Sequence, residues 1–206
     1  NISNSLLNDN YLNDNGGPNN WNGAFIQNPY YVANTRINSD KKDRYLGLVK
    51  LDYQIINELS ASLRISQDQS TTNAVVFQPV GAFDIRPNGG MIDLTSTNTI
   101  NNYDFLLNFD KDEILENISL GATIGVSQAK DNFKLVRATA ENILVPGLFS
   151  IDNFSNKNVS TDIAETKSNS LFGSLTLGYK NFAFLEVTGR NDWSSTLPID
   201  NASFFY

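Results

Sequence analysis

An alternation of apolar and polar residues over residues 170–190, SLFGSLTLGYKNFAFLEVTGR, constrains the fold more than any other feature of the sequence. Successive side chains of a β-strand point to opposite faces, so a period of two predicts strands with one apolar and one polar face. Lys180 and Asn181 lie where a two-residue hairpin turn would interrupt the pattern, and asparagine tolerates a positive φ. The stretch therefore predicts an antiparallel hairpin with one apolar face.

The same alternation occurs in two earlier segments, residues 43–66 and residues 103–127. Their turns are predicted near Asn57 and Glu58 and within residues 110–117. The fold class expected is all-β and antiparallel, with about six strands in three hairpins. Strands of about ten to twelve residues, rising about 3.3 Å each and tilted by roughly 45°, give roughly 25 Å of height, which fits the lipid-facing band of a membrane β-barrel.

The segments between the hairpins are long. Residues 67–102 and 128–169 are predicted to be extracellular loops, because short turns at one end and long loops at the other are typical of outer-membrane barrels. Residues 1–42 are predicted to be a further extracellular loop, and residues 191–206 the start of the next loop and strand. Six strands cannot close a membrane barrel, so residues 1–206 are expected to form a partial barrel domain within a longer protein.

Aromatic residues fall near both ends of the predicted strands on the apolar face, as membrane interfaces favour. The expected lipid-interface aromatics are Tyr45, Tyr53, Tyr103, Phe109 and Tyr179. The opposite face carries charges that are expected to line a lumen, namely Lys50, Asp52, Arg64, Glu186 and Arg190. Asp52 and Arg64 are expected to pair across the first hairpin. The alternative is that the aromatics are rim residues of a soluble sheet.

The composition excludes several classes of site. The chain has no histidine and no cysteine, which removes the commonest general base, metal ligands and thiol nucleophiles, and no enzyme activity is expected. Carboxylates could in principle form a hydrolase pair, from Asp84, Asp93, Asp104 and Asp192. A net charge of −7 argues against a nucleic-acid partner.

An asparagine-rich stretch, NDNYLNDNGGPNN, superficially resembles a calcium loop. Aligning Gly16 with the glycine of an EF-hand places Asn22 where a bidentate glutamate is required, so the motif fails. No cofactor is expected, although a calcium ion held by loop Asp and Asn side chains is left open. Ligand or partner contact is assigned to aromatics in or beside the predicted loops, namely Trp21, Tyr30, Tyr31, Phe77 and Trp193. The alternative is that these aromatics pin the loops together.

Three stretches carry a family resemblance: NPYYVANTRINSDKKDRYLGLVKLDYQIINELSASLRIS, VPGLFSIDNFSN and KSNSLFGSLTLGYKNFAFLEVTGRNDWSSTLPIDNASFFY. They resemble the central barrel of SusC/RagA-type TonB-dependent outer-membrane transporters, most specifically in the segment GRNDWSSTLP. The resemblance implies a 22-stranded barrel in the outer membrane of a Gram-negative bacterium. It also implies a plug and a TonB contact outside this chain, a SusD-like surface lipoprotein as partner, and import of oligosaccharides or peptides.

The expected function is thus energy-coupled nutrient uptake, with this chain supplying barrel wall and loops. Two alternatives stay open. One is a soluble β-sandwich that binds carbohydrate or mediates adhesion, and the other is an enzyme that uses carboxylates on a β scaffold. A second sheet packed on the apolar face would favour the sandwich.

Overall fold

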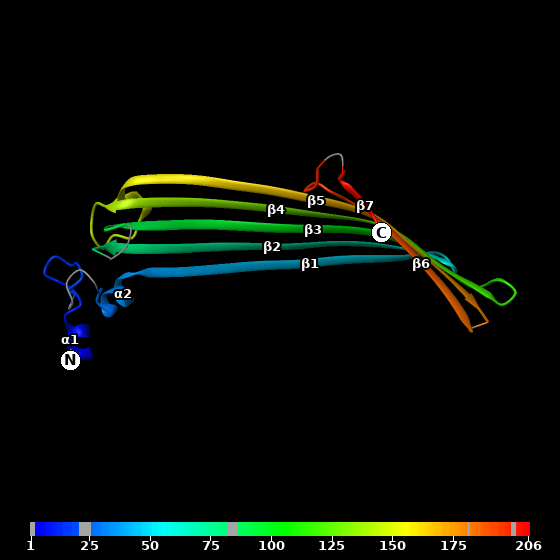
Figure 1. The fold of residues 1–206 in the computed structure, drawn as a ribbon, viewed down its shortest axis with the longest axis horizontal. Helices are drawn as coiled ribbons and strands as arrows, with labels where there is room; N and C mark the ends of the chain where they lie inside the picture. Colours follow the sequence, from blue (N-terminus) through cyan, green and yellow to red (C-terminus); the bar gives the residue numbers. More distant parts are fainter. Residues whose placement is uncertain (1–2, 21–25, 82–85, 181, 199–200) are drawn as a thin grey trace. The chain divides into compact units, whose positions relative to one another are not determined.

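The computed structural model describes residues 3–20, 26–81, 86–180, 182–198 and 201–206. Its main feature is a single antiparallel sheet in which each strand pairs with the next along the chain (Figure 1). The strands are β1 (Ile37–Ile56), β2 (Leu59–Val80), β3 (Asn88–Leu115), β4 (Ile118–Ile143), β5 (Phe154–Tyr179), β6 (Ala183–Ser194) and β7 (Ser203–Phe205). The predicted all-β antiparallel fold is confirmed.

Among the described residues, short helical segments precede β1 and β5. They are α1 (Asn4–Asp9), α2 (Pro29–Thr35) and the 3-10 turn η1 (Ile151–Asn153). The Asn28 side chain caps α2 by accepting from the backbone N–H of Tyr30, and Pro29 occupies the first turn, where no backbone donor is needed. No helix in the described part of the chain combines the length and the apolar character that crossing a bilayer requires.

Tight turns connect the strands of each hairpin. β1 and β2 meet at Asn57 and Glu58, and β3 and β4 meet at Glu116 and Asn117. Asn117 has a φ of 64° and Lys180, at the start of the third turn, a φ of 50°. Asparagine tolerates this left-handed region because its short polar side chain bonds locally. Asn181, the other residue predicted for the third turn, lies outside the described residues.

The segments 67–102 and 128–169 are mostly strand, so the prediction of long loops there is wrong. β2 and β3 leave only residues 81–87 between them, and β4 and β5 leave residues 144–153. These strand extensions carry Ser, Thr, Asn and Gln on both faces, so the alternation that revealed the hairpins is absent from them. Side-chain hydrogen bonds between neighbouring strands occur there instead. For example, Thr95 on β3 donates to Asn73 on β2 at 2.9 Å.

The chain divides into two compact units. Unit 1 comprises Asn1–Asp43, Thr71–Thr97 and Lys134–Asp162, and unit 2 comprises Arg44–Ser70, Asn98–Phe133 and Ile163–Tyr206. Unit 1 has a small hydrophobic core of buried residues from β2, β3, β4 and β5, namely Phe77, Met91, Ala140 and Phe154. Phe77 meets the rings of Phe149 and Phe154 edge to face, with centroids 4.6 and 6.4 Å apart.

Unit 2 is a single layer of sheet in its described residues, with strands and their connections but no second layer. The register of β5 and β6 places Leu175 opposite Val187 and Leu177 opposite Leu185, so these side chains share one face. Leu175 is 41% exposed and Leu185 60% exposed. We call this the apolar face, and none of the described residues of unit 2 forms an element that covers it.

Candidate functional site

The apolar face of unit 2 carries the aromatics predicted to lie at lipid interfaces. Tyr45, Tyr53, Tyr103 and Tyr179 are exposed, with Tyr45 at 71%, and Phe109 is half-buried. Between them lie aliphatic side chains that are also exposed, including Leu63, Ile124 and Val187. Exposed apolar side chains that gather on one face mark an interaction surface.

The opposite face of unit 2, called the polar face, carries ion pairs. Lys50 Nζ lies 2.9 Å from Asp52 Oδ2 on the same strand, and Asp52 also accepts a hydrogen bond from Ser62 on β2. Arg64 pairs with Asp104 on β3, where its Nε lies 2.8 Å from Oδ2. The predicted pair of Asp52 and Arg64 is therefore wrong, because each residue has a closer partner of its own.

Asp104 links three strands, since it accepts from Arg64 on β2 and from Ser127 Oγ on β4 at 2.6 Å. We expect a double-mutant cycle of Arg64→Ala and Asp104→Ala to give a coupling free energy of about 1 kcal/mol or less, because the Arg64 side chain is 52% exposed and solvent screens the pair. Equilibrium unfolding of the four proteins in the cycle measures this coupling. A value several times larger would show that the polar face is not solvated.

Arg190 is the centre of a second cluster on the polar face. Its Nε lies 2.9 Å from Asp192 Oδ1, and its second terminal nitrogen donates to Ser170 Oγ at 3.0 Å. Tyr206 donates to the other oxygen of Asp192 at 2.6 Å. The guanidinium also lies 5.7 Å from the ring centre of Phe172, its partner in the register of β5 and β6. These contacts hold Arg190 flat against the sheet.

Phe172 is a residue whose role sequence reasoning missed. It breaks the alternation by placing an aromatic ring among polar neighbours, and that break was the available signal. Its ring covers Gly125 of β4 so closely that a Cβ at Gly125 would lie 2.4 Å from the ring. Gly125 is therefore required by this contact.

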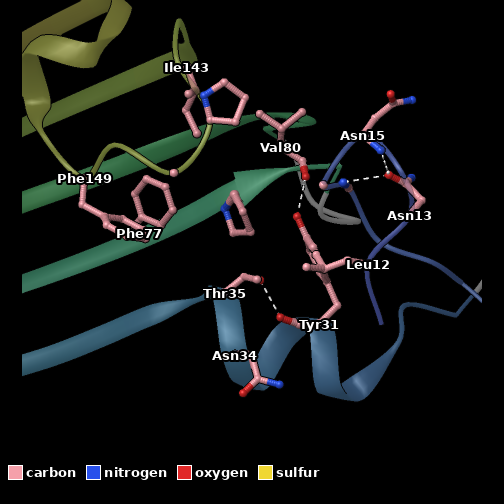
Figure 2. Close-up of a pocket in the computed structure, with 15 residues that line it drawn as sticks. Leu12, Asn13, Asn15, Tyr31, Asn34, Thr35, Phe77, Val80, Ile143 and Phe149 are labelled. Atoms are coloured by element: carbon pink, nitrogen blue, oxygen red, sulfur yellow. Dashed lines mark hydrogen bonds between the residues drawn. The ribbon is translucent and has the colours of Figure 1, made fainter. Parts of the chain in front are cut away.

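A cavity of about 370 Å³ lies in unit 1, between α2, the end of β2 and the segment that follows β4 (Figure 2). Its wall is mostly apolar, with asparagine and threonine side chains among the lining residues. The lining residues are Leu12, Asn13, Asn15, Gly16, Gly17, Tyr31, Asn34, Thr35, Phe77, Pro79, Val80, Ile143, Pro146, Gly147 and Phe149. Two of the five predicted contact residues, Tyr31 and Phe77, thus meet at one cavity.

Tyr31 is 1% exposed, and its hydroxyl donates to the Val80 carbonyl oxygen at 2.6 Å (Figure 2). The hydrogen bond attaches α2 to the end of β2. Burial raises the pKa of the Tyr31 hydroxyl above its ordinary value, so the group is a neutral donor at physiological pH. Tyr31 and Phe77 therefore pin the surrounding segments together as well as lining the cavity.

The Tyr31→Phe variant is expected to lose about 1–2 kcal/mol of stability in unit 1, because the Val80 carbonyl loses its donor. The folded state holds the phenolic proton more tightly than the unfolded state does. The contribution of Tyr31 is therefore full below about pH 10 and is lost as the pH rises through the raised pKa. Alkaline unfolding followed by circular dichroism should show a shallower pH dependence for Tyr31→Phe than for the unmodified protein, and equal slopes would contradict this role.

The remaining predicted contact residues lie elsewhere. Tyr30 is half-buried and is not among the residues lining the cavity, and Trp193 lies opposite Asn169 in the sheet of unit 2. Trp21 lies outside the described residues, as does the candidate carboxylate Asp84. Phe149, which completes the aromatic cluster at the cavity, was missed because VPGLFS lies in a segment without alternation.

The asparagine-rich segment forms a tight turn at the edge of the cavity. Asn13 Oδ1 accepts from the backbone N–H groups of Asn15 and Gly17, at 3.0 and 2.9 Å. The side-chain oxygen that would be offered to a cation is thus used by the turn. In the described part of the chain, no three carboxylates gather as a metal site would require. The prediction of no cofactor, with a loop calcium ion left open, stays untested.

Comparison with known proteins gives matches in structure only. No family model matches the chain, and no curated protein matches it. A solved structure of the RagAB peptide transporter aligns with a TM-score of 0.78 at 16% identity, covering 87% of this chain and 20% of that one. Structures of the RagAB peptide importer in the closed-closed and open-open states align with TM-scores of 0.78 and 0.77, each at 17% identity.

In fold, the chain resembles a segment of the RagAB transporter. The predicted resemblance to SusC/RagA-type proteins is therefore confirmed for the fold. The chain spans about a fifth of the length of the RagAB chains that it matches.

Proposed function

We propose that this chain forms part of the barrel wall of a TonB-dependent outer-membrane transporter of the SusC/RagA type. The observation that carries the proposal is the apolar face of unit 2, which is aliphatic at its centre, aromatic at its ends and uncovered by any second layer in the described residues. The similarity in fold to the RagAB peptide transporter supports it. A soluble β-sandwich is disfavoured because its apolar face would be packed against a second sheet.

In this proposal, the two faces of unit 2 contact different surroundings, lipid on one side and water on the other. The apolar face would contact acyl chains, with Tyr45 and Tyr103 near one interface and Tyr53, Phe109 and Tyr179 near the other. The polar face would line the lumen, where Arg64 and Arg190 are neutralised by Asp104 and Asp192. Lys50 and Asp52 form a further pair, and Glu186 lies opposite Thr176 in the register. A wall of paired charges gives a hydrated surface with little fixed potential.

The proposed cargo is a peptide, because the structures that share this fold are described as peptide transporters and importers. An oligosaccharide, the other cargo that the family resemblance implies, is the second candidate. The proposed partners are a SusD-like surface lipoprotein and, through a plug outside this chain, TonB. The cavity beside Tyr31 and Phe77 is the proposed contact site for an apolar side chain of the cargo or the lipoprotein, since its wall is largely apolar.

A non-enzymatic role is proposed on two grounds. The structures similar in fold are transporters. Two of the carboxylates considered for hydrolysis, Asp104 and Asp192, already accept hydrogen bonds from arginine and hydroxyl donors.

The experiment that tests the proposed location is fractionation of the producing bacterium. We expect the protein in the outer-membrane fraction, released only by detergent, with an electrophoretic mobility that changes on boiling. Recovery as a soluble monomer would contradict the proposal.

Cargo and coupling are tested by uptake of labelled peptides and labelled oligosaccharides in cells with and without the gene. We expect peptide uptake to fall in the deletion strain and to depend on TonB. If only oligosaccharide uptake falls in the deletion strain, the cargo is an oligosaccharide and not a peptide. If uptake of both is unchanged, a transport role is contradicted. Purification without cross-linking tests whether a surface lipoprotein accompanies the protein.

A further inference from the structure

We infer that the boundary between the hydrocarbon core and the lipid headgroups crosses the apolar face of unit 2 at a row of amide side chains, with Trp193 in that boundary. The inference rests on the proposed function. It also assigns Trp193 to the lipid surface rather than to cargo.

The apolar face changes character within one two-residue step on each of four neighbouring strands. The steps run from Ile65 to Gln67 on β2, from Tyr103 to Asn101 on β3, from Val126 to Gln128 on β4 and from Leu171 to Asn169 on β5. Residues two apart on a strand point to the same face. The change is therefore in the solvent that one face meets, and it falls within about one two-residue step of the same level on the four strands.

The amides at this level bond to each other across the strands. Gln67 donates to Asn101 at 2.9 Å, and Gln128 donates to Asn169 at 2.8 Å. Further from the apolar region, Lys130 and Glu165 form an ion pair at 3.0 Å on the same face, one two-residue step past Gln128 and two past Asn169. Amides paired side to side tolerate partial dehydration, whereas a lysine and a glutamate need water. The order aliphatic, amide, ion pair follows the rise in polarity from acyl chains to headgroups to water.

Trp193 belongs to this level by register, because it lies opposite Asn169 in the pairing of β5 and β6. It lines a hollow on unit 2 together with Tyr103, Leu171 and Gln128, and is 39% exposed. An indole at a junction of aliphatic and amide side chains matches the headgroup level, where tryptophan is favoured because one end of its ring is apolar and the other carries an N–H donor.

The distance to the opposite boundary is consistent with a bilayer. On β5 the apolar face runs from Leu171 to Tyr179, about nine residues, and a tilted strand needs about 9–11 residues to span the hydrocarbon core. Tyr179 then marks the other interface. The residues of β2 to β5 that follow the amide row within unit 2 would lie in water, which fits the polar side chains there, such as Gln69, Asp131 and Glu165.

Depth-dependent quenching tests the boundary. Single cysteines at positions 165, 169, 175 and 193 would carry a bimane fluorophore, since the chain has no cysteine of its own. The full-length protein, freed of any cysteine elsewhere, would be reconstituted into phosphatidylcholine vesicles that contain lipids with a nitroxide on the headgroup or on carbon 12 of the acyl chain. We expect labels at 169 and 193 to be quenched most by the headgroup nitroxide, the label at 175 by the carbon-12 nitroxide, and the label at 165 by neither.

The outcomes separate the inference from the proposed function. If the label at 175 is not quenched by either lipid, the apolar face does not meet acyl chains and the proposed function fails. If the label at 175 is quenched but those at 169 and 193 respond most to the carbon-12 nitroxide, or to neither, the boundary lies elsewhere and only the inference is overturned. Tryptophan fluorescence of unlabelled Asn169→Cys and Leu175→Cys confirms that these variants fold.

Discussion

Replacing Leu175 with arginine is expected to lower the free energy of unfolding of the membrane-inserted protein by about 2–4 kcal/mol. Leu175 is near the middle of the apolar stretch from Leu171 to Tyr179 and lies opposite Val187. An arginine there would have to lose its hydration or draw water into the hydrocarbon core. Reversible unfolding from phospholipid vesicles in guanidinium chloride measures the change.

The matched control is Ser174→Arg, one residue away on the same strand. Ser174 lies opposite Thr188 and faces the other side of the sheet from Leu175. We expect Ser174→Arg to change stability by less than about 0.5 kcal/mol, because a solvated polar face accepts an added charge. Equal costs for the two arginines would mean that the two faces meet the same solvent, and the assignment of lipid and lumen would be wrong.

The Phe77→Ala variant is expected to destabilise unit 1 by about 3–5 kcal/mol, because it empties the centre of a small core. Phe77 is 3% exposed and contacts the rings of Phe149 and Phe154. Hydrogen exchange of the backbone amides of β2 and β4 within unit 1 reports the loss as faster exchange. The variant should also weaken binding of any ligand held by the cavity, whose wall Phe77 forms in part.

Val76→Ala serves as the control for Phe77→Ala. Val76 is the preceding residue of β2 and is 40% exposed, so its truncation is expected to cost about 1 kcal/mol or less. A comparable effect of both substitutions on amide exchange would show that unit 1 depends on strand propensity rather than on its aromatic core.

The hairpins were predictable because one face of each strand is apolar and the other polar. Leu175, Leu177 and Val187 alternate with Ser174 and Thr188, and the register confirms that the two sets face opposite sides. The strand extensions were missed for the same physical reason. Where both faces meet polar surroundings, as around Asn73 and Thr95, hydrophobic periodicity carries no signal, and only long-range pairing reveals the strand.

Two of the aromatic residues proposed for contact line one cavity, but the sequence alone did not predict that they meet there. Tyr31 and Phe77 were identified as aromatics of the predicted loops, yet their meeting at one cavity depends on α2, β2 and the segment after β4 coming together. From the sequence, Arg64 is expected to form an ion pair with Asp52, because both residues belong to the same hairpin. It bonds to Asp104 on β3, because the next strand offers a carboxylate at 2.8 Å. Such choices between neighbouring strands are decided by register, which composition does not encode.

The most direct test of the central claim is the accessibility of spin labels placed one at a time from Gly173 to Tyr179 in the reconstituted protein. Collisions with oxygen, which concentrates in acyl chains, and with a water-soluble nickel chelate are measured for each label by electron paramagnetic resonance. We expect labels at 173, 175, 177 and 179 to collide mainly with oxygen, and those at 174, 176 and 178 mainly with the chelate. Loss of this alternation, or protection of the odd positions from both reagents as under a second sheet, would contradict a lipid-facing apolar face.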